Sequence, residues 1–312
     1  MSDSNYDSVE EDNPRQVLDT DGDFEVPGAI PPLTLKLHEI PGMFGYTGNP
    51  AGPQPRPCFM PIRPVPYPAL VWRAQAAMGE GTNGIWCATV FRPASGADDS
   101  PMALFAPRPI NTANEGVLST RFVVRRRYVP RIAGLKTMLL MTHGVCHDEG
   151  CPNARGGWAF IYKPGPEGIV KGVLEQMGPN NQLHILTTQR AKLRAAIAAL
   201  EFCAWSHEGW ERVIIATNSD YLANGATTYM GTWATRGWRT SVNSPVKNRD
   251  LWESLGNRMR ETAEGGCVVS FWQIPRAWNT GAYEAAKAAA DSGEIRIEYS
   301  KLKGLKSWGE LG

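Results

Sequence analysis

Residues 140–160, LMTHGVCHDEGCPNARGGWAF, carry the side chains best suited to chemistry in this sequence. Within them, His143, Cys146, His147 and Cys151 form an H-x-x-C-H-x-x-x-C pattern, and imidazole and thiolate are ligands that zinc prefers. The pattern falls in a run of strand length, where neighbouring side chains point to opposite faces of a sheet. Because this alternation points Cys146 and its neighbour His147 to opposite faces, we favour a structural role and keep a zinc site as the alternative.

A second group of chemically useful residues is basic and aromatic. Residues 121–131 read RFVVRRRYVPR, and residues 119–136 contain six basic residues and no acid. Arginines interleaved with Phe122 and Tyr128 could bind nucleic acid through phosphate contacts and stacking on bases. The same pattern is typical of a solvated edge strand, whose charges block pairing with another chain. The sequence leaves both interpretations open.

The elements that must position these groups are strands and helices that alternate in the second half of the chain. Apolar runs of strand length alternate there with alanine-rich segments of helical spacing, in which Leu193, Ile197 and Leu200 share one face. This order predicts a mixed sheet with helices on its faces. The predicted strands are 137–146, 156–163, 169–177, 212–217 and 267–275, and the predicted helices are 187–206, 219–234, 247–265 and 280–293.

The first 133 residues differ in composition from the rest of the chain. Residues 1–30 are acidic and poor in large apolar groups, which predicts a disordered tail. Residues 31–133 are rich in proline and then basic, and the pattern assigns no fold to this extension. Its proline-rich part is a linker or a polyproline ligand for a protein partner. We expect a single domain at 134–295 and a C-terminal tail at 296–312.

Composition excludes some function classes for the whole chain. The 312 residues carry a net charge of +1, which gives no global attraction to nucleic acid or to a membrane surface. No apolar run approaches the roughly 20 residues that a membrane-spanning helix needs. Six cysteines without a recognisable signal peptide favour free thiols and an intracellular location, nuclear or cytoplasmic. The oligomeric state cannot be predicted.

Five ordered passages resemble ribonuclease H of type 1, in its fungal-like form, over about residues 134–295. The resemblance implies an α/β, ribonuclease H-like fold: a five-stranded mixed sheet flanked by helices, here with a long N-terminal extension. It also implies an activity, cleavage of the RNA strand of an RNA–DNA hybrid, in which four carboxylates hold two Mg²⁺ ions. The five passages are GVCHDEGCPNARGGWAF, TTQRAKLRAAIAALE, VIIATNSDYLANGAT, TRGWRTSVNSPVKNRDLW and FWQIPRAWNTGAYEAAKAAA.

The sequence departs from the family at all four carboxylate positions. Aspartates that end two strands fall on His143 and Asn218, the glutamate of the first helix falls on Lys192, and the aspartate that opens the last helix falls on Tyr283. Mg²⁺ prefers carboxylate and water ligands, and an ammonium group repels it. We therefore expect a pseudoenzyme with no intact catalytic residue and no Mg²⁺ cofactor. Acids that could rebuild a site are Asp148, Glu149, Asp220 and Glu284.

The resemblance implies that the DNA side of the family's substrate groove is retained. Thr187 and Asn248 match positions that hold a DNA phosphate. Tyr229, Trp233 and Ser241 match a channel in which aromatic faces meet deoxyribose. Aromatic rings and small hydroxyl groups suit a strand that lacks 2′-hydroxyls, because they pack where a hydroxyl would clash.

The RNA side of the groove is altered. Cys146 and Gln189 match retained positions, whereas Glu149 replaces an asparagine and places a carboxylate near phosphates, which lowers affinity. Lys192 has two interpretations. Its ammonium contacts the scissile phosphate in place of a metal, or it pairs with a nearby acid.

Three functions remain open from the sequence. The first is a catalytically degenerate ribonuclease H-like protein that binds an RNA–DNA hybrid, or another DNA-containing duplex, without metal-dependent cleavage. The second is a protein-interaction scaffold that has lost nucleic-acid binding and uses the N-terminal extension for its partner. The third is an RNA–DNA hybrid ribonuclease with a rebuilt site. Trp233, Thr187 and Asn248 favour the first, whereas Glu149 and the nearly balanced charge of 134–295 favour the second.

Overall fold

The computed structural model describes residues 74–78, 86–93, 99–111, 118–125 and 136–302. All of them belong to one unit, Ile62–Gly312. The predicted acidic tail, the proline-rich stretch and Tyr128 lie outside the described residues. Within the described part of the chain, no helix is long and apolar enough to cross a membrane.

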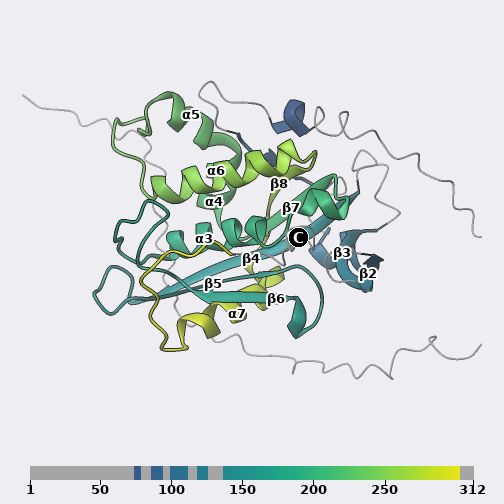
Figure 1. The fold of residues 1–312 in the computed structure, drawn as a ribbon, viewed down its shortest axis with the longest axis horizontal. Coiled ribbons are helices and arrows are strands. Elements are labelled where there is room, and N and C mark those ends of the chain that lie inside the picture. Colours follow the sequence, from purple (N-terminus) through teal and green to yellow (C-terminus); the bar gives the residue numbers. More distant parts are fainter. Residues whose placement is uncertain (1–73, 79–85, 94–98, 112–117, 126–135, 303–312) are drawn as a thin grey trace, which may run out of the picture. The chain divides into compact units, whose positions relative to one another are not determined.

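Five strands form the mixed sheet that the sequence predicts, so that prediction is confirmed (Figure 1). The first three form an antiparallel meander, and the last two run parallel to the first strand. Their order across the sheet is β6-β5-β4-β7-β8. The strands are β4 (Thr137–His147), β5 (Arg155–Ile161), β6 (Ile169–Val173), β7 (Arg212–Thr217) and β8 (Val268–Gln273).

Helices cover both faces of this sheet, as Figure 1 shows. On one face α3 packs against β4 and β5, with α6 against α3, while α7 packs on the opposite face against β4, β5 and β6. The side chains of β4 alternate accordingly: Met138 and Leu140 join the core cluster under α3, and Leu139 joins a second cluster. The helices are α3 (Thr188–Glu201), α4 (Asp220–Asn224), α5 (Met230–Thr235), α6 (Arg249–Glu264) and α7 (Thr280–Ala290), with the π-helical turn η4 (Gly225–Tyr229) between α4 and α5.

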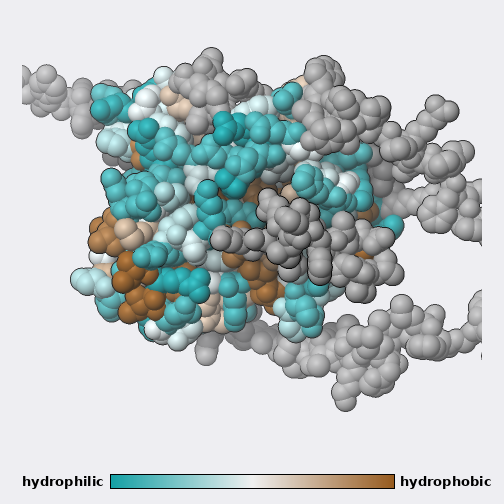
Figure 2. Space-filling view, viewed as in Figure 1, coloured by the Kyte–Doolittle hydropathy of each residue, from teal (hydrophilic) through white to brown (hydrophobic). Residues whose placement is uncertain are grey.

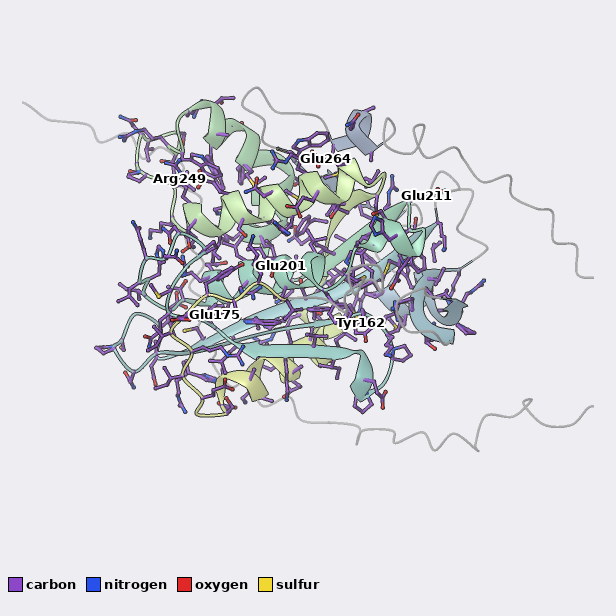
Figure 3. All side chains as sticks on the ribbon, in the orientation of Figure 1. Tyr162, Glu175, Glu201, Glu211, Arg249 and Glu264 are labelled. Atoms are coloured by element: carbon purple, nitrogen blue, oxygen red, sulfur yellow. The ribbon has the colours of Figure 1, made fainter. Side chains whose placement is uncertain are left out.

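Helix α3 is buried all round, which its sequence pattern does not predict. Leu193, Ile197 and Leu200 are buried as expected, but so are Arg190 and Arg194 on the other sides. The reason is that α6 and the segment after α7 cover the outer face of α3. Buried cations then need acids within hydrogen-bonding distance. Arg190 pairs with Asp250 of α6, and Arg194 pairs with Glu175 and Glu201, both labelled in Figure 3.

The extension contributes three further strands to the same sheet, which has eight strands in the described residues. β1 pairs parallel with β8 at one edge. β2 and β3 form a hairpin that meets the beginning of β4 through the pair Val123–Met138. The pattern assigned no fold to this region: β1 has only two residues, and β2 contains two prolines. These elements are β1 (Thr89–Val90), α2 (Pro101–Leu104), β2 (Phe105–Asn111) and β3 (Leu118–Val124).

Residues 121–125 are the described part of the basic run. Phe122 is buried in the second core cluster, so the predicted stacking role is wrong for this residue. Arg121 is 1% exposed and its guanidinium pairs with Glu208. β3 lies between β2 and β4 and is therefore not an edge strand. The edge is β2, which contains Pro107 and Pro109, and proline in a sheet is typical of edges.

The beginning of the predicted C-terminal tail is joined to the domain. The amides of Gln176 and Met177 donate to the carbonyls of Arg296 and Ile297, at 2.9 and 2.8 Å. Arg194 Nη2 donates to the Ser300 carbonyl at 2.7 Å. The boundaries at 134 and 295 stay predictions, but residues on both outer sides of them pack with the domain.

Candidate functional site

Three of the four positions singled out in the sequence meet at one end of the sheet. β4 and β7 are parallel with Met141 opposite Ala216, so His143 and Asn218 each stand two residues beyond that pair. His143 Nδ1 lies 2.8 Å from Asn218 Oδ1. The rings of His143 and Tyr283, the latter on α7, are 5.3 Å apart in an edge-to-face arrangement. β4, the end of β7 and α7 therefore each supply one side chain.

Hydrogen bonds fix which ring nitrogen of His143 carries the proton. Asn279 Nδ2 lies 2.9 Å from the Thr142 carbonyl, which can only accept, so this atom is the donor nitrogen of the amide. The same nitrogen donates to Asn218 Oδ1 at 3.2 Å. Since Asn218 Oδ1 accepts, His143 Nδ1 must be its donor. Nε2 is then the nitrogen that takes up a second proton when the ring becomes charged.

Lys192, the fourth position, is held beside this cluster by the close approach of α3 to β4. A Cβ atom on Gly144 would overlap the backbone of Ala191 and Lys192, so glycine at 144 permits the contact. This places the Lys192 backbone against the residue that follows His143. The Lys192 side chain is 5% exposed. The four positions thus lie in one region, and none of them is a carboxylate.

The nearby acids are engaged elsewhere. Glu149 Oε2 accepts the backbone N–H of Thr188 at 3.0 Å, at the beginning of α3. Asp148 accepts from Asn153, and Asp220 accepts from Gln273. In the described part of the chain, no three His, Cys, Asp or Glu side chains lie together as a metal-binding group. A rebuilt carboxylate site is therefore not seen among these residues.

The zinc pattern of the sequence does not converge either. His143 bonds Asn218, whereas His147 Nε2 lies at ion-pair distance, 3.0 Å, from Asp291 Oδ1. The Cys146 thiol donates to the His147 carbonyl. Burial, reinforced by Glu149 and Asp148, raises the pKa of Cys146 to about 12. A thiol with so high a pKa stays protonated at neutral pH.

Three aromatic side chains, here called the aromatic ladder, pack in a row from the core to the surface: Trp252, Trp233 and Tyr229. Trp252 is buried, and its ring lies 5.4 Å from that of Trp233. The Trp233 ring is in turn 5.7 Å from Tyr229, which is 45% exposed. Trp252 Nε1 donates to the Tyr221 hydroxyl at 2.9 Å. The predicted channel residues Tyr229 and Trp233 form the outer end of this ladder.

Thr187 and Asn248 are both hydrogen-bonded to Arg190, a residue that the sequence pattern did not single out. Thr187 Oγ1 accepts the Arg190 N–H at 3.2 Å and begins α3, while Asn248 Oδ1 accepts from Arg190 Nη1 at 3.4 Å. Asp250 holds the same guanidinium with two hydrogen bonds, of 2.9 and 2.8 Å. The sequence signal that could have identified Arg190 is its charge within an alanine-rich helix. Arg190 therefore sets the distance between the two predicted phosphate ligands.

The remaining predicted groove residues are less closely joined. Gln189 Oε1 is buried and has no hydrogen-bond partner among the described residues. Ser241 is exposed in the turn in which Thr240 N–H donates to the Ser244 carbonyl. No contact of the described residues joins Ser241 to Trp233 or Tyr229, so its place in the channel stays a prediction.

Comparison with known proteins identifies the central region of the chain. The sequence profile of the RNase H family matches residues 136–267. Ribonuclease HI of Xylella fastidiosa is 36% identical over 123 residues, which are 39% of this chain and 71% of the relative. Ribonuclease H of Cereibacter sphaeroides is 38% identical over 117 residues, which are 36% of this chain and 69% of the relative.

Solved structures of lower similarity also match. The crystal structure of LC9-RNase H1, a type 1 RNase H with the type 2 active-site motif, is 24% identical with a TM-score of 0.35. The match covers 51% of this chain and 75% of that one. Both ribonuclease H relatives are more than 30% identical to this chain, and each match covers more than two thirds of the relative's length. The chain therefore belongs to the ribonuclease H family.

Proposed function

We propose that this protein binds an RNA–DNA hybrid, or another DNA-containing duplex, without metal-dependent cleavage. The cluster of His143, Asn218 and Tyr283 carries this proposal. His143 is hydrogen-bonded to Asn218 and packs edge-to-face on the Tyr283 ring, at positions where the family resemblance implies metal-binding carboxylates. Two-metal hydrolysis needs anionic ligands that neutralise both ions and orient the attacking water. An imidazole, an amide, a phenol and an ammonium supply no such charge.

Lys192 adds repulsion to the loss of ligands. An ammonium about 4 Å from a unit positive charge is unfavourable by roughly 4 kcal/mol at an effective dielectric constant near 20, and Mg²⁺ carries two charges. The same ammonium favours a phosphate at the position of the metal. We propose that Lys192 contacts the phosphate that an active relative would cut, so that binding requires no magnesium.

Other described residues supply the contacts that we propose for the two strands of a hybrid. Gln189, at a position that the family resemblance assigns to the RNA strand, is the proposed contact for a ribose hydroxyl. Tyr229 and Trp233 present an aromatic surface for the deoxyribose strand. Thr187 and Asn248, both hydrogen-bonded to Arg190, are the proposed contacts for a DNA phosphate. The relatives are named ribonucleases, which supports a nucleic acid as the partner, and the family resemblance implies the hybrid as the duplex.

Substitution of Lys192 tests this function. In EDTA, we expect Lys192→Glu to weaken binding of a fluorescent hybrid by roughly tenfold or more, because a carboxylate would repel the phosphate that lysine contacts. Lys192→Met is the matched control: it removes the charge and adds none, so its loss is smaller. Fluorescence anisotropy gives the dissociation constants, and thermal unfolding verifies that both variants fold. Equal affinity of the native chain and both folded variants would contradict the phosphate contact.

The protein-interaction scaffold is the second candidate. Figure 2 shows apolar patches on a largely hydrophilic face, and exposed aliphatic side chains include Leu183 and Ile185 as well as Ile295 and Ile297. Glu149 also occupies the Thr188 amide at the beginning of α3, where a phosphate would otherwise bind. A native chain that binds neither hybrid nor DNA duplex would favour this candidate over the first.

A further inference from the structure

We propose that the edge segment, residues 86–91 of the N-terminal extension, positions the aromatic pair Tyr229 and Trp233 and so sets the DNA-strand side of the groove. This inference rests on the proposed function, because it assigns the aromatic pair to a bound strand. The family profile begins at residue 136, so the edge segment lies outside the region matched by the family. The edge segment therefore belongs to a part of this chain that the family profile does not include.

The edge segment is fixed to the sheet on one side. Its strand β1 pairs parallel with β8, with Thr89 opposite Ser270. The hydroxyls of these two residues are 2.6 Å apart, and the Phe91 N–H donates to the Phe271 carbonyl at 2.8 Å. Trp86 and Ala88 are buried in the main core cluster. These contacts make the edge segment an extension of the rigid sheet.

On its other side, the edge segment contacts the backbone on both sides of Tyr229. The Ala88 N–H donates to the Ala226 carbonyl at 3.0 Å, three residues before Tyr229. Cys87 lies against Gly231, two residues after Tyr229: a Cβ atom on Gly231 would stand 3.1 Å from the Cys87 sulfur. Burial raises the pKa of the Cys87 thiol, so it is an uncharged packing group at neutral pH.

The segment that carries the aromatic pair depends on such support. It consists of α4, the π-helical turn η4 and α5, which have 5, 5 and 6 residues. Helices this short are marginal on their own, and π-helical turns are rare and frequently occur at functional sites. Their position is therefore set by packing. Trp252 supports the Trp233 ring from the core, and the edge segment holds Ala226 and Gly231.

One substitution, together with a second that should reverse its effect, tests this role. Gly231→Ala places a methyl group 3.1 Å from the Cys87 sulfur, so Cys87 or the segment that carries Tyr229 must shift by a few tenths of an ångström. We expect hybrid binding to weaken by roughly threefold to tenfold, and Gly231→Ala with Cys87→Ala to recover most of the affinity because the sulfur is gone. Since alanine is a better helix former than glycine, a loss of helix stability would not explain the single variant.

The assay separates this inference from the function on which it rests. Anisotropy with the hybrid is measured in EDTA for the native chain, Gly231→Ala and the double variant. A native chain that does not bind would contradict the proposed function itself. Native binding with an unaffected Gly231→Ala variant, or with a weakened variant that Cys87→Ala fails to rescue, would overturn only the role of the edge segment. Loss followed by rescue supports it.

Discussion

Restoring carboxylates at the four family positions is expected to give this chain a Mg²⁺-dependent nuclease activity. The variant carries His143→Asp, Lys192→Glu, Asn218→Asp and Tyr283→Asp. Four carboxylates at these positions could hold two Mg²⁺ ions, activate a water and stabilise the leaving oxygen. We expect cleavage of an RNA–DNA hybrid at a rate at least about a hundredfold above that of the native chain, an effect of at least about 3 kcal/mol on the barrier.

An isosteric amide variant is the matched control for this experiment. It carries His143→Asn, Lys192→Gln and Tyr283→Asn with the native Asn218, so it has the shape of the carboxylate variant without its charge. Only the carboxylate variant should bind Mg²⁺ in calorimetry and cut the RNA strand on a denaturing gel. A folded carboxylate variant that binds Mg²⁺ no better than the amide control would contradict the assignment of these four positions.

Removing one side chain of the extension, with Arg121→Met, is expected to destabilise the whole domain by about 3–5 kcal/mol, because it leaves a buried acid without its cation. Arg121 and Glu208 are both almost fully buried, with Arg121 Nη2 3.0 Å from Glu208 Oε1. Trp210 Nε1 also donates to Glu208 Oε2 at 3.0 Å. The Arg121 guanidinium lies 4.8 Å from the centre of the Tyr162 ring, which is labelled in Figure 3.

A double-mutant cycle separates the ion pair from the loss of packing. Glu208→Gln neutralises the acid and keeps its shape, so Arg121→Met with Glu208→Gln should be more stable than Arg121→Met alone. Denaturant unfolding at equilibrium gives the four free energies and the coupling between the two sites. Exposed ion pairs usually contribute less than about 1 kcal/mol to the free energy of unfolding. If Arg121→Met lowers the free energy of unfolding by no more than this, β3 contributes little to the stability of the fold.

The strands and helices after residue 136 could be predicted because their local pattern and their tertiary environment agree. The apolar run 137–146 is continuous because β4 is covered on both faces, by α3 and by α7. The last helix, α7, and the strand before it, β8, could be predicted from the sequence for the same reason. Parallel pairing of β4 with β7 then brings His143 and Asn218 together without any local signal for that contact.

The fold of the extension could not be predicted because its strands and buried charges depend on contacts with residues far away in the sequence. β1 has two residues and depends on β8, which is about 180 positions later in the chain. Arg121 looks like a surface charge until Glu208, from a distant segment, is placed beside it. The same holds for Arg190, whose partner Asp250 lies on α6. Pairs of this kind decide which charged residues are buried, and a single sequence does not show them.

The most direct test of the central claim is incubation of the purified native chain with a 5′-labelled RNA–DNA hybrid, in EDTA and in Mg²⁺. Native and denaturing gels then report binding and cleavage separately. We predict a shifted and uncut hybrid in both buffers. Mg²⁺-dependent cleavage that persists through stringent purification, and that is lost when Asp148 or Asp220 is replaced by asparagine, would contradict the claim and establish a rebuilt active site.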